Sequence, residues 1–184
     1  MAFVVITNST IQNHGQNGIH VAEGATARIG FEYYSDALPS ANTISANAQA
    51  GILIGYNSTA QIYNNIISNN TLRGVRIENG SSAHLSNNTI NSNGTGIVVV
   101  NNSSAQLGFN YPPTGMADYP NYTTALNANV GIWWSNGGVV TGHLGSTNQV
   151  NGANFQFGGS TINGVPANAF AANCATKESD LAIP

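Results

Sequence analysis

The sequence predicts an all-β solenoid, in which short parallel strands coil around one axis with about 22 to 23 residues per turn. Two observations predict it. Apolar residues recur at a fixed step, and each step contains three short apolar runs separated by Gly, Asn and Ser. Charged residues make up only 6% of the 184-residue chain. Scarce charge suits a stack of identical positions, because like charges on neighbouring strands repel each other.

The step is clearest between residues 42 and 108. Ile44, Ile67 and Ile90 are 23 residues apart. Two further columns keep steps of 23 and 22 residues: Ile52, Val75 and Ile97, and Ala60, Ala83 and Ala105. The runs GILI, GVRI and GIVV alternate with period two, as strands do, and their β-branched residues and Gly disfavour a helix. We therefore expect three strands in each turn of the coil.

Asparagines keep the same step as the isoleucines. The recurring positions form two columns: Asn42, Asn65 and Asn88, and Asn47, Asn70 and Asn93. Stacked Asn side chains can donate from one amide to the carbonyl oxygen of the next. The sequence therefore predicts two structural Asn ladders along the coil.

The successive patterns N-x-I, N, G-I-x-V and S-A-x-I resemble the repeat of right-handed parallel β-helix proteins. The resemblance covers roughly residues 4–108 and extends more loosely to about residue 150. It implies a right-handed, single-stranded parallel β-helix of about five to six rungs. Pectate lyases, polygalacturonases, phage tailspikes and many uncharacterised bacterial β-helix repeat proteins have such a coil. The pattern is specific for the fold and says little about function.

We expect the β-helix to span residues 1–150, with insertions at 31–41 and 109–126, and a C-terminal capping segment at 151–184. Both insertions follow the same corner of the repeat and open with Gly-Phe-x-Tyr. Three rungs separate them, so they should project from one side about 14 Å apart. A cap is expected because the open end of a coil exposes unpaired backbone groups. Cys174 in this segment is expected to be a small buried hydrophobic residue.

The insertions hold much of the aromatic content. Their tyrosines are candidate polysaccharide-binding residues, since the phenol ring is apolar and its hydroxyl is polar: Tyr33, Tyr34, Tyr111, Tyr119 and Tyr122. A structural role in the loops is an equally good interpretation of these five. For Phe31 and Phe109 we favour the structural role, as anchors that hold each insertion against the coil.

Catalytic candidates are weak. In lyases of the resembled family, a strand-face Arg abstracts a proton beside carboxylate-bound calcium. Arg76 matches that Arg, but it has only Glu78 nearby, and an exposed ion pair is the simpler interpretation. Glu32 or Asp36 could meet Asp118 between the insertions as a glycosidase pair. We expect no metal site and no cofactor. His84 lies in an outward polar column with Arg28, Gln61 and Gln106, and is expected to be solvated.

Outward positions of the second strand include Leu53, Val98 and Trp133, which predict an exposed apolar face and a homo-oligomer. The net charge of -3 offers no basic surface for nucleic acid. No apolar run approaches the ~20 residues of a membrane span. The N-terminus shows no signal peptide, and we expect a fragment of a longer extracellular or cell-surface protein.

These observations favour a non-catalytic secreted or surface module that binds glycan or assembles with copies of itself. The first alternative is a polysaccharide lyase or glycoside hydrolase that acts between the two aromatic insertions. The second is a structural spacer without a ligand.

Overall fold

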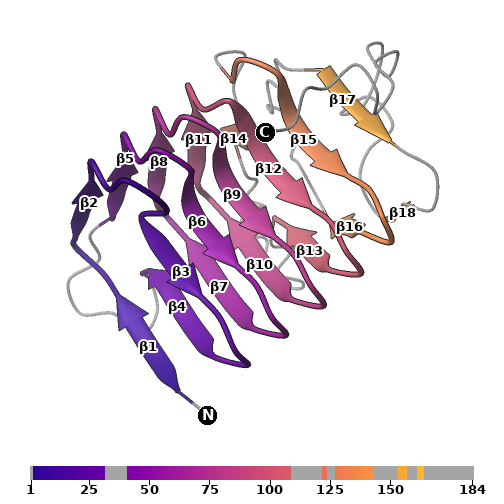
Figure 1. The fold of residues 1–184 in the computed structure, drawn as a ribbon, viewed down its shortest axis with the longest axis horizontal. Coiled ribbons are helices and arrows are strands. Elements are labelled where there is room, and N and C mark those ends of the chain that lie inside the picture. The colour runs from indigo at the N-terminus through magenta and orange to yellow at the C-terminus, as the bar shows by residue number, and fades with distance from the viewer. Residues whose placement is uncertain are drawn as a thin grey trace, which may run out of the picture.

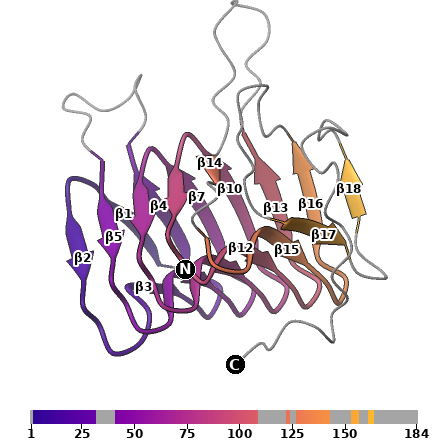
Figure 2. The same cartoon turned by 90° about the horizontal axis from the view of Figure 1, so that it is seen from above.

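A computed structural model describes residues 2–31, 41–108, 122–123, 127–142, 153–156 and 161–163. Within these residues every regular element is a β-strand, and the strands form three sheets. The sheets run along one axis, with the N-terminal strands at one end and the C-terminal strands at the other (Figures 1 and 2).

Each sheet takes one strand from each turn of the coil, in chain order. Sheet A has seven strands: β1 (Phe3–Ile6), β4 (Thr26–Gly30), β7 (Thr59–Tyr63), β10 (Ser82–Ser86), β13 (Ser104–Leu107), β16 (Val139–Gly142) and β18 (Thr161–Asn163). Sheet B has five: β2 (Thr10–Gln12), β5 (Thr43–Ser45), β8 (Ile66–Ser68), β11 (Thr89–Asn91) and β14 (Tyr122–Thr123). Sheet C has six: β3 (Ile19–Val21), β6 (Ala50–Ile54), β9 (Arg73–Ile77), β12 (Thr95–Val99), β15 (Val130–Trp134) and β17 (Ala153–Gln156).

All neighbouring strands pair in parallel, and their register follows the sequence columns. Ile44 pairs with Ile67, and Ile67 pairs with Ile90. Likewise Ile52 pairs with Val75, and Ala60 pairs with Ala83. The predicted all-β coil of parallel strands, with three strands in each turn, is therefore confirmed.

The inward-facing columns of the three sheets make a single core. Its best-buried large residues have no more than 1% of their surface exposed: Ile29, Ile44, Ile52, Ile54, Ile62, Ile67, Ile77, Leu85, Ile90, Ile97 and Trp134. Alanines fill one column of sheet A, where Ala27, Ala60 and Ala105 are each 1% exposed. The β-branched residues fit here because a pleated strand buries every second side chain.

The first Asn ladder lies inside the coil at the corner before sheet B. Asn42 Nδ2 donates to Asn65 Oδ1 at 2.9 Å, and Asn65 Nδ2 donates to Asn88 Oδ1 at 2.9 Å. The same amide nitrogens also donate to backbone carbonyls of sheet A: Ile6 at 2.8 Å, Ile29 at 2.9 Å and Ile62 at 2.7 Å. All three asparagines are buried. These bonds satisfy polar groups that would be costly to bury alone.

The second ladder follows sheet B and is one residue longer than predicted. Asn47 Nδ2 donates to Asn70 Oδ1 at 2.9 Å, and Asn70 Nδ2 donates to Asn93 Oδ1 at 3.0 Å. Asn93 Nδ2 then donates to Asn127 Oδ1 at 3.3 Å. Asn127 comes 34 residues after Asn93. The second insertion therefore leaves the ladder uninterrupted.

A glycine column of sheet C packs against this ladder. At Gly74 a Cβ atom would lie 2.5 Å from Ile90 Cγ2, 2.7 Å from the carbonyl oxygen of Gly96 and 3.0 Å from Asn93 Nδ2. Only a residue without a side chain fits this position. The Gly of the repeat pattern G-I-x-V is therefore set by packing against the second ladder.

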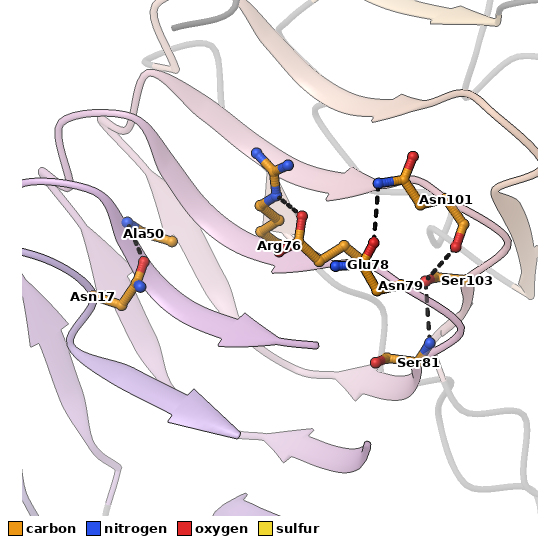
Figure 3. Close-up of polar contacts among 8 residues, drawn as sticks. All are labelled: Asn17, Ala50, Arg76, Glu78, Asn79, Ser81, Asn101 and Ser103. Atoms are coloured by element: carbon orange, nitrogen blue, oxygen red, sulfur yellow. Dashed lines mark hydrogen bonds and ion pairs between the residues drawn. The ribbon is translucent and has the colours of Figure 1, made fainter. Parts of the chain in front are cut away.

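The corners of the coil use left-handed backbone conformations. Of the fourteen non-glycine residues with positive φ among the described residues, ten are asparagines. Asn tolerates this conformation better than other residues with a Cβ atom. Some corner amides also bond between rungs: Asn101 Nδ2 donates to Asn79 Oδ1 at 3.2 Å (Figure 3). The abundance of Asn thus has two structural causes, the buried ladders and the left-handed corners.

Two observations concern the predicted domain limits. Tyr122 and Thr123 of β14 pair with Thr89 and Ile90 of β11, so part of the stretch predicted as the second insertion belongs to the coil. Strands β17 and β18 pair in parallel with β15 and β16 and continue sheets C and A within 151–184. The other residues of 151–184, Cys174 among them, lie outside the described residues, and the capping role stays a prediction.

Candidate functional site

Both insertions leave the coil from one column of sheet A. Gly30 pairs with Tyr63, and Tyr63 pairs with Ser86. Gly108 follows Leu107, which pairs with Leu85, so it occupies the position of Ser86 one rung further. Gly30 and Gly108 have φ angles of 99° and 75°. The last described residues before the two insertions therefore include equivalent glycines, three strand spacings or about 14 Å apart.

The residues predicted to act between the insertions fall largely outside the described residues. This holds for Glu32, Tyr33, Tyr34, Asp36, Phe109, Tyr111, Asp118 and Tyr119. For Tyr122 the structure describes the backbone position in β14. Their roles in ligand binding or catalysis stay predictions.

Phe31 is described, and it is buried with 7% of its surface exposed. Its carbonyl oxygen accepts a hydrogen bond from Asn64 Nδ2 at 2.6 Å. Burial and this bond both hold the start of the first insertion to the coil. Both observations agree with the predicted anchoring role of Phe31, which stays a prediction because residues 32–40 lie outside the described residues.

A tyrosine and a histidine hold the base of the second insertion. The Tyr63 hydroxyl lies 2.7 Å from His84 Nδ1, and His84 Nε2 lies 3.1 Å from the carbonyl oxygen of Gly108. The rings meet edge to face with centroids 5.1 Å apart. In this geometry Nε2 carries a proton that it donates to Gly108, and Nδ1 accepts the tyrosine proton. Both nitrogens of a neutral imidazole are satisfied.

His84 is therefore not the solvated residue that the sequence predicts. It is half-buried, and burial lowers the pKa of its imidazole, while the bond to the Gly108 carbonyl acts in the opposite direction. The correction has a simple cause. Alternation shows that His84 points outward from sheet A, but Tyr63 and Gly108 come from the two neighbouring strands and cover it.

The outer face of sheet A between the insertions is polar and nearly uncharged. One outward column holds Arg28, Gln61, His84 and Gln106, and the next holds Thr26, Thr59, Ser82 and Ser104. The side chains of Thr59, Gln61, Ser104 and Gln106 are exposed. Successive members of a column are about 4.8 Å apart, the spacing of paired strands. The face therefore presents amides and hydroxyls in two regular rows.

Sheet C carries a different cluster on its outer face. Arg76 Nε lies 2.6 Å from Glu78 Oε2 (Figure 3). The pair that the sequence predicts is thus present, but it is not fully exposed, since the side chains are 26% and 13% exposed. Arg73 on the same strand is buried. Burial and the positive charge of Arg76 lower the pKa of Arg73 to about 10, and Glu78 partly opposes this. Arg73 remains protonated at neutral pH.

Glu78 and Glu23 are the carboxylates within the described residues. The position of Glu23 is followed along its column by Tyr56 and Asn79, so the two acids lie at neighbouring corner positions two rungs apart, about 10 Å. Glycosidases place their carboxyl groups about 5 to 9.5 Å apart. Within the described part of the chain, no group of three or more His, Cys, Asp or Glu side chains could hold a metal ion. The estimated backbone separation of Glu23 and Glu78 thus lies just beyond the range of a glycosidase pair.

Two of the three residues of the predicted apolar face of sheet C are buried. Leu53, Arg76, Val98 and Trp133 do share one outward column. However, Val98 is only 1% exposed and Trp133 only 5%, while Leu53 is partly exposed. The expectation that this face is open to a partner is wrong for Val98 and Trp133, because both side chains are buried within the single chain. Self-association of the protein stays a prediction.

Comparison with known proteins identifies the fold. A family model described as "Right handed beta helix region" matches residues 6–111, more than half of the chain. Searches of curated proteins and of solved structures give no match. No helix in the described residues is long and apolar enough to cross a membrane.

Proposed function

Since this chain belongs to the family of right-handed β-helix regions, a fold that serves many activities, we propose that it is a non-catalytic module that binds a neutral polysaccharide outside the cell. The observation that carries the proposal is the polar outer face of sheet A on strands β4, β7, β10 and β13. The two insertions of the sequence follow the first and the last of these strands, after the equivalent residues Gly30 and Gly108.

The chemistry of this face suits sugar hydroxyls. Gln61 and Gln106 offer amide donors and acceptors, and Thr59 and Ser104 offer hydroxyls that can do both. These four side chains are exposed. Arg28 is the one Lys or Arg side chain in the two columns, and neither column contains an acid. An uncharged ligand therefore loses little solvation free energy when it moves from water onto this surface.

The regular spacing favours an extended chain over a small molecule. Equivalent side chains recur about every 4.8 Å along the axis of the coil. A polysaccharide that lies across the strands would meet an exposed amide and hydroxyl pair on β7, Gln61 with Thr59, and a second pair two rungs further on β13, Gln106 with Ser104. Tyr33 and Tyr111, which lie in the two insertions of the sequence, are the aromatic residues that the proposal assigns to the sugar rings of the ligand. Many weak equivalent contacts can then act together.

The test is native gel electrophoresis of the chain in gels that contain neutral or acidic polysaccharides, followed by staining of the polymer. The proposal expects slower migration with at least one neutral polysaccharide, and weaker retardation for Gln61→Ala combined with Gln106→Ala. Gln12→Ala is the matched control, because Gln12 is an exposed glutamine on β2 of sheet B.

Three results would contradict the proposal. A cleared track behind the protein would identify a degrading enzyme instead. Retardation by acidic polymers alone would exclude a neutral ligand. Unchanged migration in every gel would leave the coil as a spacer or an assembly unit.

A further inference from the structure

Asn-Gly pairs recur along this chain, and such pairs can undergo a spontaneous chemical modification. The backbone nitrogen of Gly attacks the side-chain carbonyl carbon of Asn, because Gly has no Cβ atom to obstruct the approach. A bond forms between this nitrogen and Asn Cγ, the Cγ–Nδ2 bond breaks, and ammonia leaves with the proton of the Gly N–H. Water then opens the cyclic imide and leaves either Asp or isoaspartate.

The structure describes both residues of the pairs that begin at Asn17, Asn79, Asn93 and Asn136. The reaction requires an Asn side chain that can turn and a Gly N–H that is not held in a hydrogen bond. Groups that the fold holds react only after a local opening. The hydrogen bonds around each pair therefore decide which Asn reacts in the folded chain.

Two of the four pairs are held at both reacting groups. Asn17 Oδ1 accepts the backbone N–H of Ala50 at 3.1 Å (Figure 3), and the N–H of the following Gly donates to the Ala50 carbonyl at 3.0 Å. Asn93 is 2% exposed, and its Nδ2 donates to Asn127 Oδ1 at 3.3 Å. The N–H of the Gly after Asn93 donates to the Asn70 carbonyl at 3.2 Å. Neither pair is free to react without opening of the coil.

The other two pairs, at Asn79 and Asn136, occupy equivalent corners between sheets C and A. Each Asn stands three residues before a strand of sheet A, β10 and β16, and both strands pair with β13. The φ angles of the two asparagines are 54° and 49°, and those of the glycines that follow are 74° and 76°. These φ angles therefore do not distinguish the two pairs.

Their hydrogen bonds do distinguish them. Asn79 Oδ1 accepts from Asn101 Nδ2 at 3.2 Å (Figure 3), and the N–H of the following Gly donates to the Asn101 carbonyl at 3.0 Å. Asn136 is exposed, whereas Asn79 is partly buried. The Asn136 carbonyl accepts one backbone bond from the rung before, at 3.0 Å. Within the described residues, its side-chain amide and the Gly137 N–H have no hydrogen-bond partner.

We propose that Asn136 is a modification site, at which the folded chain forms Asp and isoaspartate without an enzyme. The Gly137 nitrogen is the nucleophile, and water completes the reaction. The product adds a carboxylate to a chain whose net charge is already -3, and isoaspartate lengthens the backbone between β15 and β16 by one carbon atom. Asn136 lies outside the two outward columns of sheet A, so the inference does not depend on the proposed function.

The experiment ages the intact chain in weakly alkaline buffer, once folded and once unfolded in guanidinium chloride. Peptide mapping by mass spectrometry measures the conversion at each of the four asparagines. Asn101→Gly removes the amide that bonds to Asn79 Oδ1, while Gly tolerates the left-handed backbone at this corner. Asn69→Gly is the matched control, because Asn69 is an exposed left-handed Asn at another corner. Circular dichroism establishes that both variants are folded.

In the folded chain Asn136 should convert at least about tenfold faster than Asn17, Asn79 or Asn93, because those three pairs must first break two hydrogen bonds. In the unfolded chain the four rates should be similar, since each Asn precedes a Gly. Conversion at Asn79 should rise in Asn101→Gly and stay unchanged in Asn69→Gly.

Two results would overturn the proposal. The first is a folded chain in which Asn136 converts no faster than the three held asparagines. The second is a preference for Asn136 that persists in the unfolded chain, because the sequence around Asn136 would then explain it without the hydrogen bonds.

Discussion

Asn93 donates a side-chain hydrogen bond to Asn127 at 3.3 Å, although the two residues are 34 positions apart in the sequence. The earlier steps of the same ladder are 23 residues long. Asn127 Oδ1 also accepts the backbone N–H of Asn93 at 3.0 Å, and Asn127 Nδ2 donates to the Ile90 carbonyl at 3.1 Å. The coil therefore resumes its register after the second insertion, and buried amide bonds fix the point at which it does so.

This relationship predicts that Asn93 and Asn127 are energetically coupled. Replacing either by Ala leaves buried donors or acceptors without a partner, which costs about 1–3 kcal/mol for each unsatisfied group. The double variant should lose less than the sum of the single losses, by roughly 0.5 kcal/mol or more. Urea unfolding of the four proteins in the cycle measures this difference. Asn93→Ala with Gln106→Ala serves as the control cycle, since Gln106 is exposed on β13, and it should be additive.

The glycine column predicts a steric effect at Gly74. In Gly74→Ala the new methyl group would lie 2.5 Å from Ile90 Cγ2 and 2.7 Å from the Gly96 carbonyl oxygen. Overpacking of this kind costs about 1–3 kcal/mol. The free energy of unfolding should therefore fall by at least about 1 kcal/mol. Gly15→Ala is the matched control, because a Cβ atom at Gly15 meets nothing within 4 Å. Equal stability of the two variants, measured by urea unfolding, would refute the role assigned to the column.

The periodic part of the fold was predictable because each rung repeats the same physical requirements. Ile44, Ile67 and Ile90 are all completely buried, as a fixed step of apolar residues implies. Asn127 escaped prediction because the insertion breaks the step on which column assignment depends. Trp133 pairs with Val98. Counting residues back from Val98 along the earlier rung reaches Asn93, and the same count back from Trp133 reaches Asn127 if the later rung is allowed one extra residue. An alignment with that tolerance could have found Asn127.

The candidate site was less predictable, for two reasons. Strand alternation gives the direction of a side chain but not what covers it, so the burial of Val98 and Trp133 could not be read from the pattern. The bond between Tyr63 and His84 depends on side-chain torsions at neighbouring rungs, and the repeat carries no information about them. The insertions have no periodic pattern. Their sequence therefore shows which residues they contain but does not predict their geometry.

The Tyr63–His84 contact predicts a pH dependence of stability. Because the pKa of His84 is lowered in the folded chain, the unfolded chain binds a proton more readily as the pH falls below about 6.5. The contribution of His84 is therefore fully present above pH 6.5 and is lost as the pH falls toward the lower folded pKa. Urea midpoints at pH 7.5 and 5.0 should differ more for the unaltered chain than for His84→Gln. Gln106→Ala should retain the full difference between the two urea midpoints. A His84→Gln variant with the same difference as the unaltered chain would contradict the assignment.

The corner at Gly30 predicts a larger penalty for substitution by Ala than the corner at Gly24. With φ at 99°, any residue with a Cβ atom is strained at Gly30, and the new atom would also collide with the backbone carbonyl of Tyr63. Gly24 separates the two effects, because its φ is 72° but a Cβ atom would meet nothing within 4 Å. Gly24→Ala should lose about 1–2 kcal/mol, the cost of the left-handed conformation alone. Gly30→Ala should lose clearly more in urea unfolding, since the Tyr63 backbone cannot move without breaking its pairing in sheet A. Polysaccharide retardation should weaken in folded Gly30→Ala and persist in Gly24→Ala, because Gly30 ends β4 directly before the first insertion and Gly24 lies before that strand. A larger loss of unfolding free energy in Gly24→Ala than in Gly30→Ala would contradict the role assigned to the corner at Gly30.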